Sequence, residues 1–272
     1  MRSGIQTKQT GAERTGRAFR ILARGSSDPG ARSAQQDAFL ISDRKLSRER
    51  GMMAVLSDGM GGMRDGELYS RIATQEMIRY FETADPRQNI CDILLNAYRA
   101  ARRTALQQTG AHSGGATVVA AAVRSRRCAI LSVGDSRICL FRGGGLIPLN
   151  REHTLGRQLD ERAALGYIPE EEARYNIYRD TLTNHLCAES ELPADRCLKP
   201  FKVCPGDKLL MMSDGVSGTL SDEEIVRFLS MPRVSGADAM IEEIRRRGLP
   251  NQDNSTALIL AFESYIKTEI GG

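Results

Sequence analysis

The chain has 272 residues, of which 41% are hydrophobic and 26% are charged, as in an ordinary globular protein with one large core or two small ones. Aromatic residues make up only 5%, tryptophan is absent, and the net charge of +4 is spread along the sequence. This composition disfavours a carbohydrate cleft, a base-stacking surface and a basic groove for nucleic acid.

The six cysteines form no CxxC pair and have no metal-ligand spacing. Residues 1–18 are polar, and no apolar run approaches the length of a membrane span. We therefore expect free thiols in a reducing cytoplasm and no membrane association. We also expect a disordered tail over 1–18 and a folded domain over 19–265.

Short apolar or alternating runs predict strands along the whole chain. They lie at 19–23, 38–41, 52–56, 117–123, 128–133, 138–141, 198–203, 208–212 and 256–262. Helical periodicity predicts helices at 66–82, 90–105, 221–229 and 237–247. Residues 155–185 are polar and mostly helical in texture, which indicates an insertion over the surface. Strands from both ends of the chain and two helix pairs predict one α+β domain of layered sheets covered by helices.

Four aspartates lie where an apolar run begins or ends. Asp58, Asp135 and Asp214 each follow such a run, and Asp253 comes just before the run at 255–260. A buried strand would leave each carboxylate at the rim of the core, where gathered acids repel one another unless a cation lies between them. Oxygen ligands of this kind suit Mg²⁺ or Mn²⁺. The pattern therefore predicts a metal cluster.

Seven motifs in one order carry a family resemblance. They lie at 27–39, 58–67, 115–117, 134–137, 152–154, 213–216 and 253–256. Over residues 19–262 the chain resembles the PP2C (PPM) metal-dependent serine/threonine phosphatases, and the bacterial members most closely. The resemblance implies a four-layer α-β-β-α sandwich of two mostly antiparallel sheets flanked by helix pairs.

The resemblance also implies metal ligands. Asp58 would bridge two ions and the carbonyl of Gly59 would add a ligand, while Asp214 and Asp253 would hold the first ion. Asp37 would order water around the second ion. As an alternative reading, Asp58 and Asp214 would only cap turns, and Asp37 would only begin a strand.

Two further roles follow from the same resemblance. Asp135, together with Asp214, matches positions that bind a third, weaker ion. Asp-Ser-Arg after a strand is also typical of a hairpin turn, and this alternative explains Asp135 equally well. Arg32 matches the arginine that holds the substrate phosphate, a task for which a planar guanidinium is suited. A surface ion pair is the alternative for Arg32.

The chain departs from the family pattern at four positions. Gln36 stands where animal members carry a metal-binding glutamate, and Met60 replaces the histidine proposed there as general acid. Asn184 and Cys187 stand where the family commonly has arginine and glycine, so we expect altered substrate handling near residues 155–185 but intact activity.

The predicted function is hydrolysis of phosphoserine and phosphothreonine in proteins by a hydroxide that bridges two Mn²⁺ or Mg²⁺ ions. Residues 155–185 would form a flap that shapes substrate access. We expect a monomeric cytoplasmic enzyme that opposes a partner Ser/Thr kinase. The alternatives are a catalytically silent relative that serves as a binding module and, less favoured, another two-metal enzyme such as a nuclease.

Overall fold

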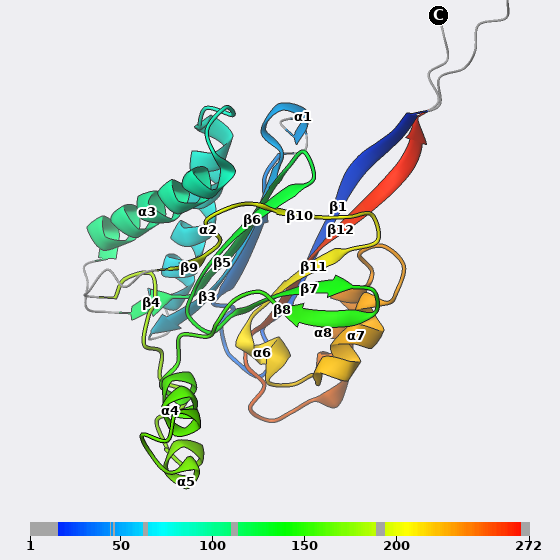
Figure 1. Cartoon of the computed structure of the whole chain (residues 1–272). Coiled ribbons are helices and arrows are strands. Elements are labelled where there is room, and N and C mark those ends of the chain that lie inside the picture. The colour runs from blue at the N-terminus through cyan, green and yellow to red at the C-terminus, as the bar shows by residue number, and fades with distance from the viewer. Residues whose placement is uncertain are drawn as a thin grey trace, which may run out of the picture.

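The computed structural model describes residues 16–43, 45, 47–61, 65–109, 114–188 and 194–267. Two antiparallel sheets lie face to face, and helices cover both outer faces (Figure 1). The predicted α+β fold and its four layers are therefore confirmed. No helix in the described part of the chain is long and apolar enough to cross a membrane.

One sheet carries both ends of the described chain. Its strand order is β1-β12-β11-β7-β8, and each neighbouring pair is antiparallel. The strands are β1 (Gly16–Asp28), β7 (Arg137–Arg142), β8 (Gly145–Pro148), β11 (Lys208–Met212) and β12 (Ser255–Lys267).

The second sheet has the order β10-β6-β5-β3-β2, with β4 paired to β3 and β9 paired to β6. Its strands are β2 (Asp37–Ile41), β3 (Met52–Gly61), β4 (Gly114–Ala116), β5 (Val118–Arg124), β6 (Arg127–Val133), β9 (Asp195–Arg196) and β10 (Phe201–Lys202). All of these pairings are antiparallel too.

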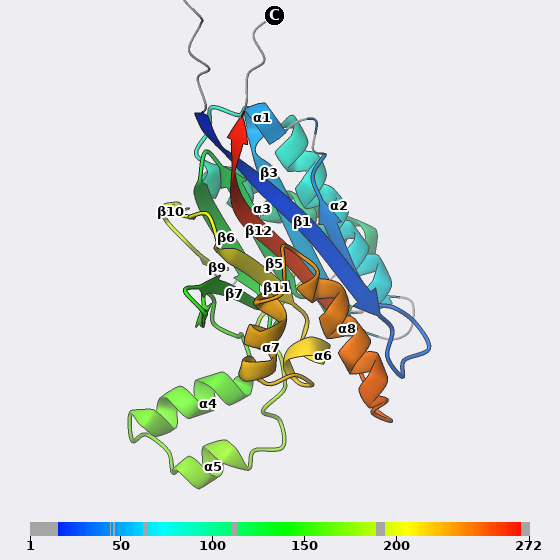
Figure 2. The same cartoon turned by 90° about the vertical axis from the view of Figure 1, so that its right-hand side faces the viewer.

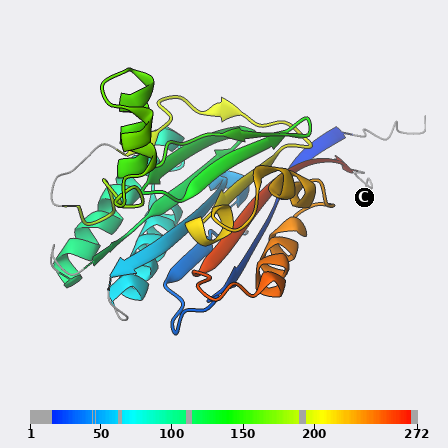
Figure 3. The same ribbon diagram turned by 90° about the horizontal axis from the view of Figure 1, so that it is seen from below.

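Two helix pairs form the outer layers, as Figure 3 shows from below. Helices α2 (Asp65–Thr83) and α3 (Ile90–Thr109) cover the second sheet, whereas α7 (Asp222–Leu229) and α8 (Gly236–Arg247) cover the first. The remaining helices are short: α1 (Ser47–Arg50), α4 (Leu155–Ala164), α5 (Glu170–Arg174) and α6 (Asp214–Ser217). Ser221 and Glu224 form a capping box at the start of α7, where the predicted helix 221–229 begins.

Strand alternation explains why apolar runs such as 52–56 are continuous. In β3, Met53 and Val55 pack in the core under α2 and α3, while Met52, Ala54 and Leu56 pack between the two sheets. Successive side chains of a strand point to opposite faces, so a strand that is covered on both faces needs apolar residues at every position. The same alternation along β12 separates the inter-sheet core from the core under α7 and α8.

Several predicted boundaries differ from the structure. Strand β1 begins at Gly16, because it pairs with β12 as far as Lys267, so the last three residues of the predicted tail belong to this strand. Residues 1–15 lie outside the described part of the chain. The strand predicted over 198–203 is wrong before Phe201, where Pro200 removes a ladder donor. The sequence reading also missed the short edge strand β8.

The predicted flap leaves the sandwich between β8 and β9 as the helix pair α4 and α5 (Figure 2). Thr154 caps α4 through its hydroxyl, which accepts from the amide of Arg157, and forms a β-bridge with Leu182. The flap therefore begins and ends at neighbouring points of the fold.

Candidate active site

The β2–β3 ladder brings together the first two candidate acids. Asp37 begins β2 and Asp58 lies near the end of β3, and the two residues are directly opposite in the antiparallel register. Asp37 is buried, with 7% of its surface exposed. The sequence interval of twenty-one residues thus becomes a cross-strand pair of like charges.

The other sheet supplies the next two acids at the same end of the sandwich. Asp214 begins α6 directly after β11, and Asp253 precedes the start of β12, the neighbour of β11. Ser213 links the two sheets here, because its hydroxyl donates to Asp37 Oδ2 at 2.8 Å and accepts from the amide of Thr256 at 3.0 Å.

Asp135 lies in the turn between β6 and β7, and these strands belong to different sheets. The hairpin explanation for this acid is therefore wrong, since the turn crosses from one layer to the other. The hydroxyls of Thr117 and Ser136 are 2.7 Å apart, and Thr117 Oγ1 also accepts from the Asp58 amide at 3.0 Å. This chain of contacts fixes the Asp135 turn beside the end of β3.

A cavity of about 330 Å³ brings the candidate residues together. Its lining includes Arg32, Asp58, Asp135, Asp214 and Asp253. The backbone around it is tightly packed, because a Cβ on Gly59 would lie 2.0 Å from the carbonyl oxygen of Gly66. A glycine is thus required beside the acid at position 58.

The acids of this centre disfavour one another's charged forms. Burial is the largest cause in each case, and it raises the pKa of Asp37 to about 6 and that of Asp135 to about 7. The pKa of Asp58 is raised well above its usual range by burial and then by the charges of Asp37, Asp214 and Asp135. Burial raises the pKa of Asp214 as well, helped by the charge of Asp253 and opposed by a hydrogen bond with Asp58.

These properties fit a divalent cation. Asp37 Oδ1 is buried and has no hydrogen-bond partner among the described residues, so one oxygen of this carboxylate is left for another ligand. All of the side-chain donors are oxygens, which Mg²⁺ and Mn²⁺ prefer. In the described part of the chain, no three His, Cys, Asp or Glu side chains form a ready-made metal-binding group. Asp58, Asp135, Asp214 and Asp253 line the cavity, whereas Asp37 is buried opposite Asp58 and is not part of the lining.

Arg32 lies at the rim of this cavity with its side chain 60% exposed. Its Nη2 donates to Asp253 Oδ2 at 2.7 Å. The ion pair that was the alternative reading of Arg32 is therefore present, and its partner is one of the candidate metal ligands.

Sequence reasoning missed Asn254, which holds the loop that carries Arg32. Its side-chain Nδ2 donates to the carbonyls of Pro29 and Ala34, and its Oδ1 accepts from the amide of Gln36 at 2.7 Å. It also missed Asp180 of the flap, which lines the same cavity. Asn254 belongs to the motif at 253–256, so the sequence could have indicated a role for it. Asp180 lies in a polar stretch with no local pattern that would distinguish it.

The positions that depart from the family pattern lie in different surroundings. Met60 and Gln36 line the acidic cavity, so neither is remote from the candidate chemistry. Asn184 and Cys187 are buried, and Cys187 packs in the core under α2 and α3. Residues 62–64 of the motif at 58–67 lie outside the described part of the chain.

Comparison with known proteins places these observations in a family. A family model described as protein phosphatase 2C matches residues 24–246. A putative protein phosphatase 2C-type protein of Streptococcus pyogenes is 30% identical over 191 residues, which cover 68% of this chain and 76% of that relative. The serine/threonine protein phosphatase PstP of Mycobacterium tuberculosis is 28% identical over 218 residues, which cover 78% of this chain but only 41% of that relative.

A solved structure gives the corresponding likeness in three dimensions. The catalytic domain of the serine/threonine protein phosphatase PstP, in complex with two manganese ions, superposes with a TM-score of 0.72 at 25% identity. The match covers 90% of this chain and 100% of that domain.

Proposed function

The chain belongs to the protein phosphatase 2C family, and from this premise we propose that it hydrolyses phosphoserine and phosphothreonine in proteins with the help of Mn²⁺ or Mg²⁺. The observation that carries this proposal is that acids of both sheets line one cavity together with Arg32. The relatives named as serine/threonine phosphatases, and the two manganese ions of PstP, support the same chemistry.

The proposed metal ligands are the residues that the sequence singled out. Asp58 would be a ligand of both ions and the carbonyl of Gly59 would add a ligand, while Asp214 and Asp253 would hold the first ion and Asp37 would order water around the second. A bound pair of ions would supply an activated water and would stabilise charge on phosphoryl oxygens. A binding ion would also compensate the repulsion that raises the pKa values of these acids.

Asp135 is proposed as a ligand of a third, weaker ion, together with Asp214. Its raised pKa and its place in the lining of the same cavity support this role. Asp135 lies on a turn between two strands, whereas Asp37 begins a paired strand and the Ser213 hydroxyl holds its carboxylate. This difference agrees with a weaker site.

Arg32 would bind the phosphate of the substrate. Its guanidinium is held by Asp253, which is itself a proposed metal ligand, so the same carboxylate would connect the metal centre with the phosphate-binding arginine. Arginine can then bind two phosphate oxygens at once. The substrates would be phosphoproteins that a Ser/Thr kinase supplies.

The test is hydrolysis of a phosphothreonine peptide with and without Mn²⁺, by the wild type and by Asp214→Asn. Asp238→Asn serves as the matched control, because Asp238 pairs with Arg24 on the surface of α8. We expect activity that a chelator abolishes and that Asp214→Asn lowers by about 10² or more, with the control unchanged. Mn²⁺ binding without hydrolysis in the wild type would instead support the silent binding module.

A further inference from the structure

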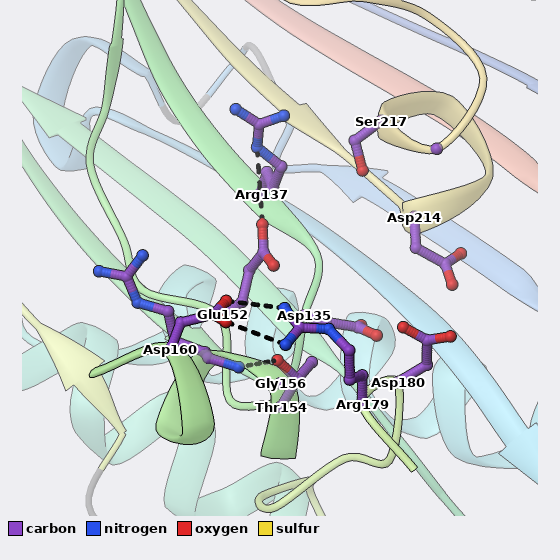
Figure 4. A pocket seen from close by; sticks show the side chains of 12 residues that line it. Asp135, Arg137, Glu152, Thr154, Gly156, Asp160, Arg179, Asp180, Asp214 and Ser217 are labelled. Atoms are coloured by element: carbon purple, nitrogen blue, oxygen red, sulfur yellow. Dashed lines mark hydrogen bonds and ion pairs between the residues drawn. The ribbon is translucent and has the colours of Figure 1, made fainter. Parts of the chain in front are cut away.

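A second cavity, of about 480 Å³, lies beside the acidic centre (Figure 4). Asp135, Asp180 and Asp214 line both cavities, so the two are continuous at these residues. The other wall of the second cavity belongs to the flap and includes Asp160 and Arg179. We refer to it below as the flap cavity.

The lining of the flap cavity has a surplus of negative charge. Each of its three arginines already has an acidic partner: Arg179 binds Asp160 at 2.7 and 2.9 Å, Arg157 binds Glu161 at 3.2 Å and Arg137 binds Asp222 at 3.2 Å. Glu161 and Asp222 do not line the flap cavity. Arg157 and Arg137 are therefore neutralised from outside the cavity, and the acids that line it are not needed for these two pairs.

Two acids of the flap cavity are then left over, apart from those of the metal centre. Glu152 lies 3.8 Å from Arg137, whose closer partner is Asp222, and the Glu152 side chain is 44% exposed. Asp180 is exposed and has no ion-pair partner among the described residues. A cationic group in this cavity would therefore meet Glu152, whose ion pair is long, and Asp180, which neighbours an arginine that Asp160 already binds, even when metal ions occupy Asp135 and Asp214.

An exposed apolar segment adjoins the flap cavity. Tyr175, Ile177 and Tyr178 are 73%, 85% and 63% exposed, and they come directly before Arg179 and Asp180. Large apolar side chains gathered on an exposed segment mark a surface that binds another molecule. The first turn of α5 has three glutamates at 170–172, so acidic residues lie close to this apolar segment in the chain.

The flap holds this segment at a fixed place. The amide of Gly156 donates to the carbonyl of Arg179 at 2.8 Å, and the amide of Leu155 donates to that of Thr181 at 2.9 Å. The Arg179 guanidinium also donates to the carbonyl of Ala173 in α5. These contacts join both ends of the flap and keep segment 175–178 beside the cavity.

We propose that the flap cavity and segment 175–178 bind the part of a phosphoprotein next to its phosphorylated residue. A lysine or arginine of the substrate would enter the flap cavity near Glu152, and an apolar side chain would lie against Tyr175, Ile177 and Tyr178. Tyrosine rings can bind both kinds of group, because their faces attract cations. This inference rests on the proposed phosphatase function and assigns its substrates a chemical class, basic and apolar around the phosphorylated residue.

The test compares three substrates in the Mn²⁺-loaded enzyme: a phosphothreonine peptide flanked by lysine and leucine, the same peptide flanked by glutamates, and p-nitrophenyl phosphate, which has no flanking residues. We expect the basic peptide to have a kcat/KM about tenfold or more above the acidic one. Glu152→Gln should reduce this preference, whereas p-nitrophenyl phosphate hydrolysis should stay unchanged.

The apolar part is tested with Ile177→Ser and Tyr178→Ala, and with Leu198→Ala as a control that is equally exposed at 74% and lies in neither cavity. Both flap variants should lower kcat/KM for the basic peptide about tenfold and leave p-nitrophenyl phosphate unchanged. An equal loss with the control or on p-nitrophenyl phosphate would overturn the inference, as would a dimer of the wild type that Tyr178→Ala dissociates. Absence of Mn²⁺-dependent hydrolysis of every substrate would instead overturn the proposed function itself.

Discussion

Asp37 and Asp58 are directly opposite each other across the antiparallel β2–β3 ladder. Like charges in this position destabilise a sheet, and here both carboxyl groups also have raised pKa values because of burial. The fold therefore maintains an arrangement that opposes its own stability, and a bound cation would relieve it.

The first prediction concerns stability without metal. Asp58→Asn removes one charge from the repulsive group and keeps the side-chain shape, so we expect the metal-free variant to be more stable than the wild type at about pH 8. A gain of about 1 kcal/mol would raise Tm by roughly 2–4 °C in a chain of this size. Thermal unfolding in chelator measures this shift.

With added Mn²⁺ the wild type should have a higher Tm than Asp58→Asn, since the wild type gains stability from binding and the variant does not. Asp238→Asn, on the surface of α8, should follow the wild type in both conditions. A lower Tm for Asp58→Asn in chelator would show that its charge does not oppose folding.

The second prediction is a pH dependence of the metal-free protein. The pKa of Asp37 is raised to about 6 and that of Asp135 to about 7, above the ordinary value of 3.8 that both would have in the unfolded chain. Between these values the folded state binds more protons than the unfolded state. The stabilising contribution is therefore complete below about pH 4 and is lost as the pH rises to about 7.

The free energy of unfolding, obtained from guanidinium titrations in chelator at several pH values, measures this dependence. Asp37→Asn and Asp135→Asn are compared with the wild type. The substitutions should flatten the decrease between about pH 4 and 7. Apparent Mn²⁺ affinity should rise over the same range, because the ligands must be deprotonated to bind. A wild type and variants with the same pH profile would contradict the assignment of these protons.

Some of this site was predictable from sequence because its signals are local. Asp58 and Asp214 end apolar runs, and strands buried on both faces need such runs. The pairing of Asp37 with Asp58 is a matter of register, and the crossing of the Asp135 turn between sheets is a matter of topology. Neither has a local pattern. The family resemblance assigned Asp37 and Asp58 to one metal centre without their register, and the explanation of Asp135 was left open.

The same reason explains why the role of Ser213 was not foreseen. Its hydroxyl contacts Asp37, which is 176 positions away in the sequence. Its neighbours suggested only a recurrent Ser-Asp-Gly tripeptide, at 57–59 and 213–215. A contact between two sheets depends on how the layers stack, and no short segment encodes that.

Ser213 provides the third prediction. Ser213→Ala removes the donor to Asp37 Oδ2 and leaves the amide of Thr256 without its acceptor in a buried site. We expect a loss of about 1–3 kcal/mol in the free energy of unfolding, because both groups stay buried. Chemical unfolding with Mn²⁺ present measures it, and Ser230→Ala is the control, since Ser230 Oγ donates to Val226 in an exposed helix end. Equal effects of the two substitutions would contradict the prediction.

The fourth prediction separates phosphate binding from metal binding. Arg32→Lys keeps the positive charge but loses the planar pair of donors, so we expect kcat/KM for a phosphothreonine peptide to fall about 10- to 100-fold, with Mn²⁺ affinity little changed. Calorimetric titration and steady-state kinetics give the two quantities. Arg24→Lys, at a surface ion pair with Asp238, is the matched control. A parallel loss of Mn²⁺ affinity would mean that Arg32 acts mainly through Asp253.

The fifth prediction concerns how the flap is held. Arg179 binds Asp160 through two hydrogen bonds and also donates to the carbonyl of Ala173, so it joins α4, α5 and the end of the flap. The Asp160 side chain is 50% exposed, and exposed ion pairs contribute only about 0–1 kcal/mol, so Arg179→Ala should leave the Tm of the whole domain nearly unchanged. Locally it should free the flap, which we expect to appear as faster amide hydrogen exchange over residues 155–182 and easier proteolysis there.

The kinetic consequence of a freed flap should depend on the substrate. For a phosphoprotein that contacts segment 175–178, Arg179→Ala should have a kcat/KM about tenfold lower than the wild type. The reason is that binding must first order the freed flap surface. p-Nitrophenyl phosphate is too small to reach the flap and should be hydrolysed as before. The double variant Asp160→Arg with Arg179→Asp should regain part of this kcat/KM, since the ion pair can form again with the two charges exchanged. An unaltered exchange rate over the flap in Arg179→Ala would show that the backbone contacts of Gly156 and Leu155 hold it without this ion pair.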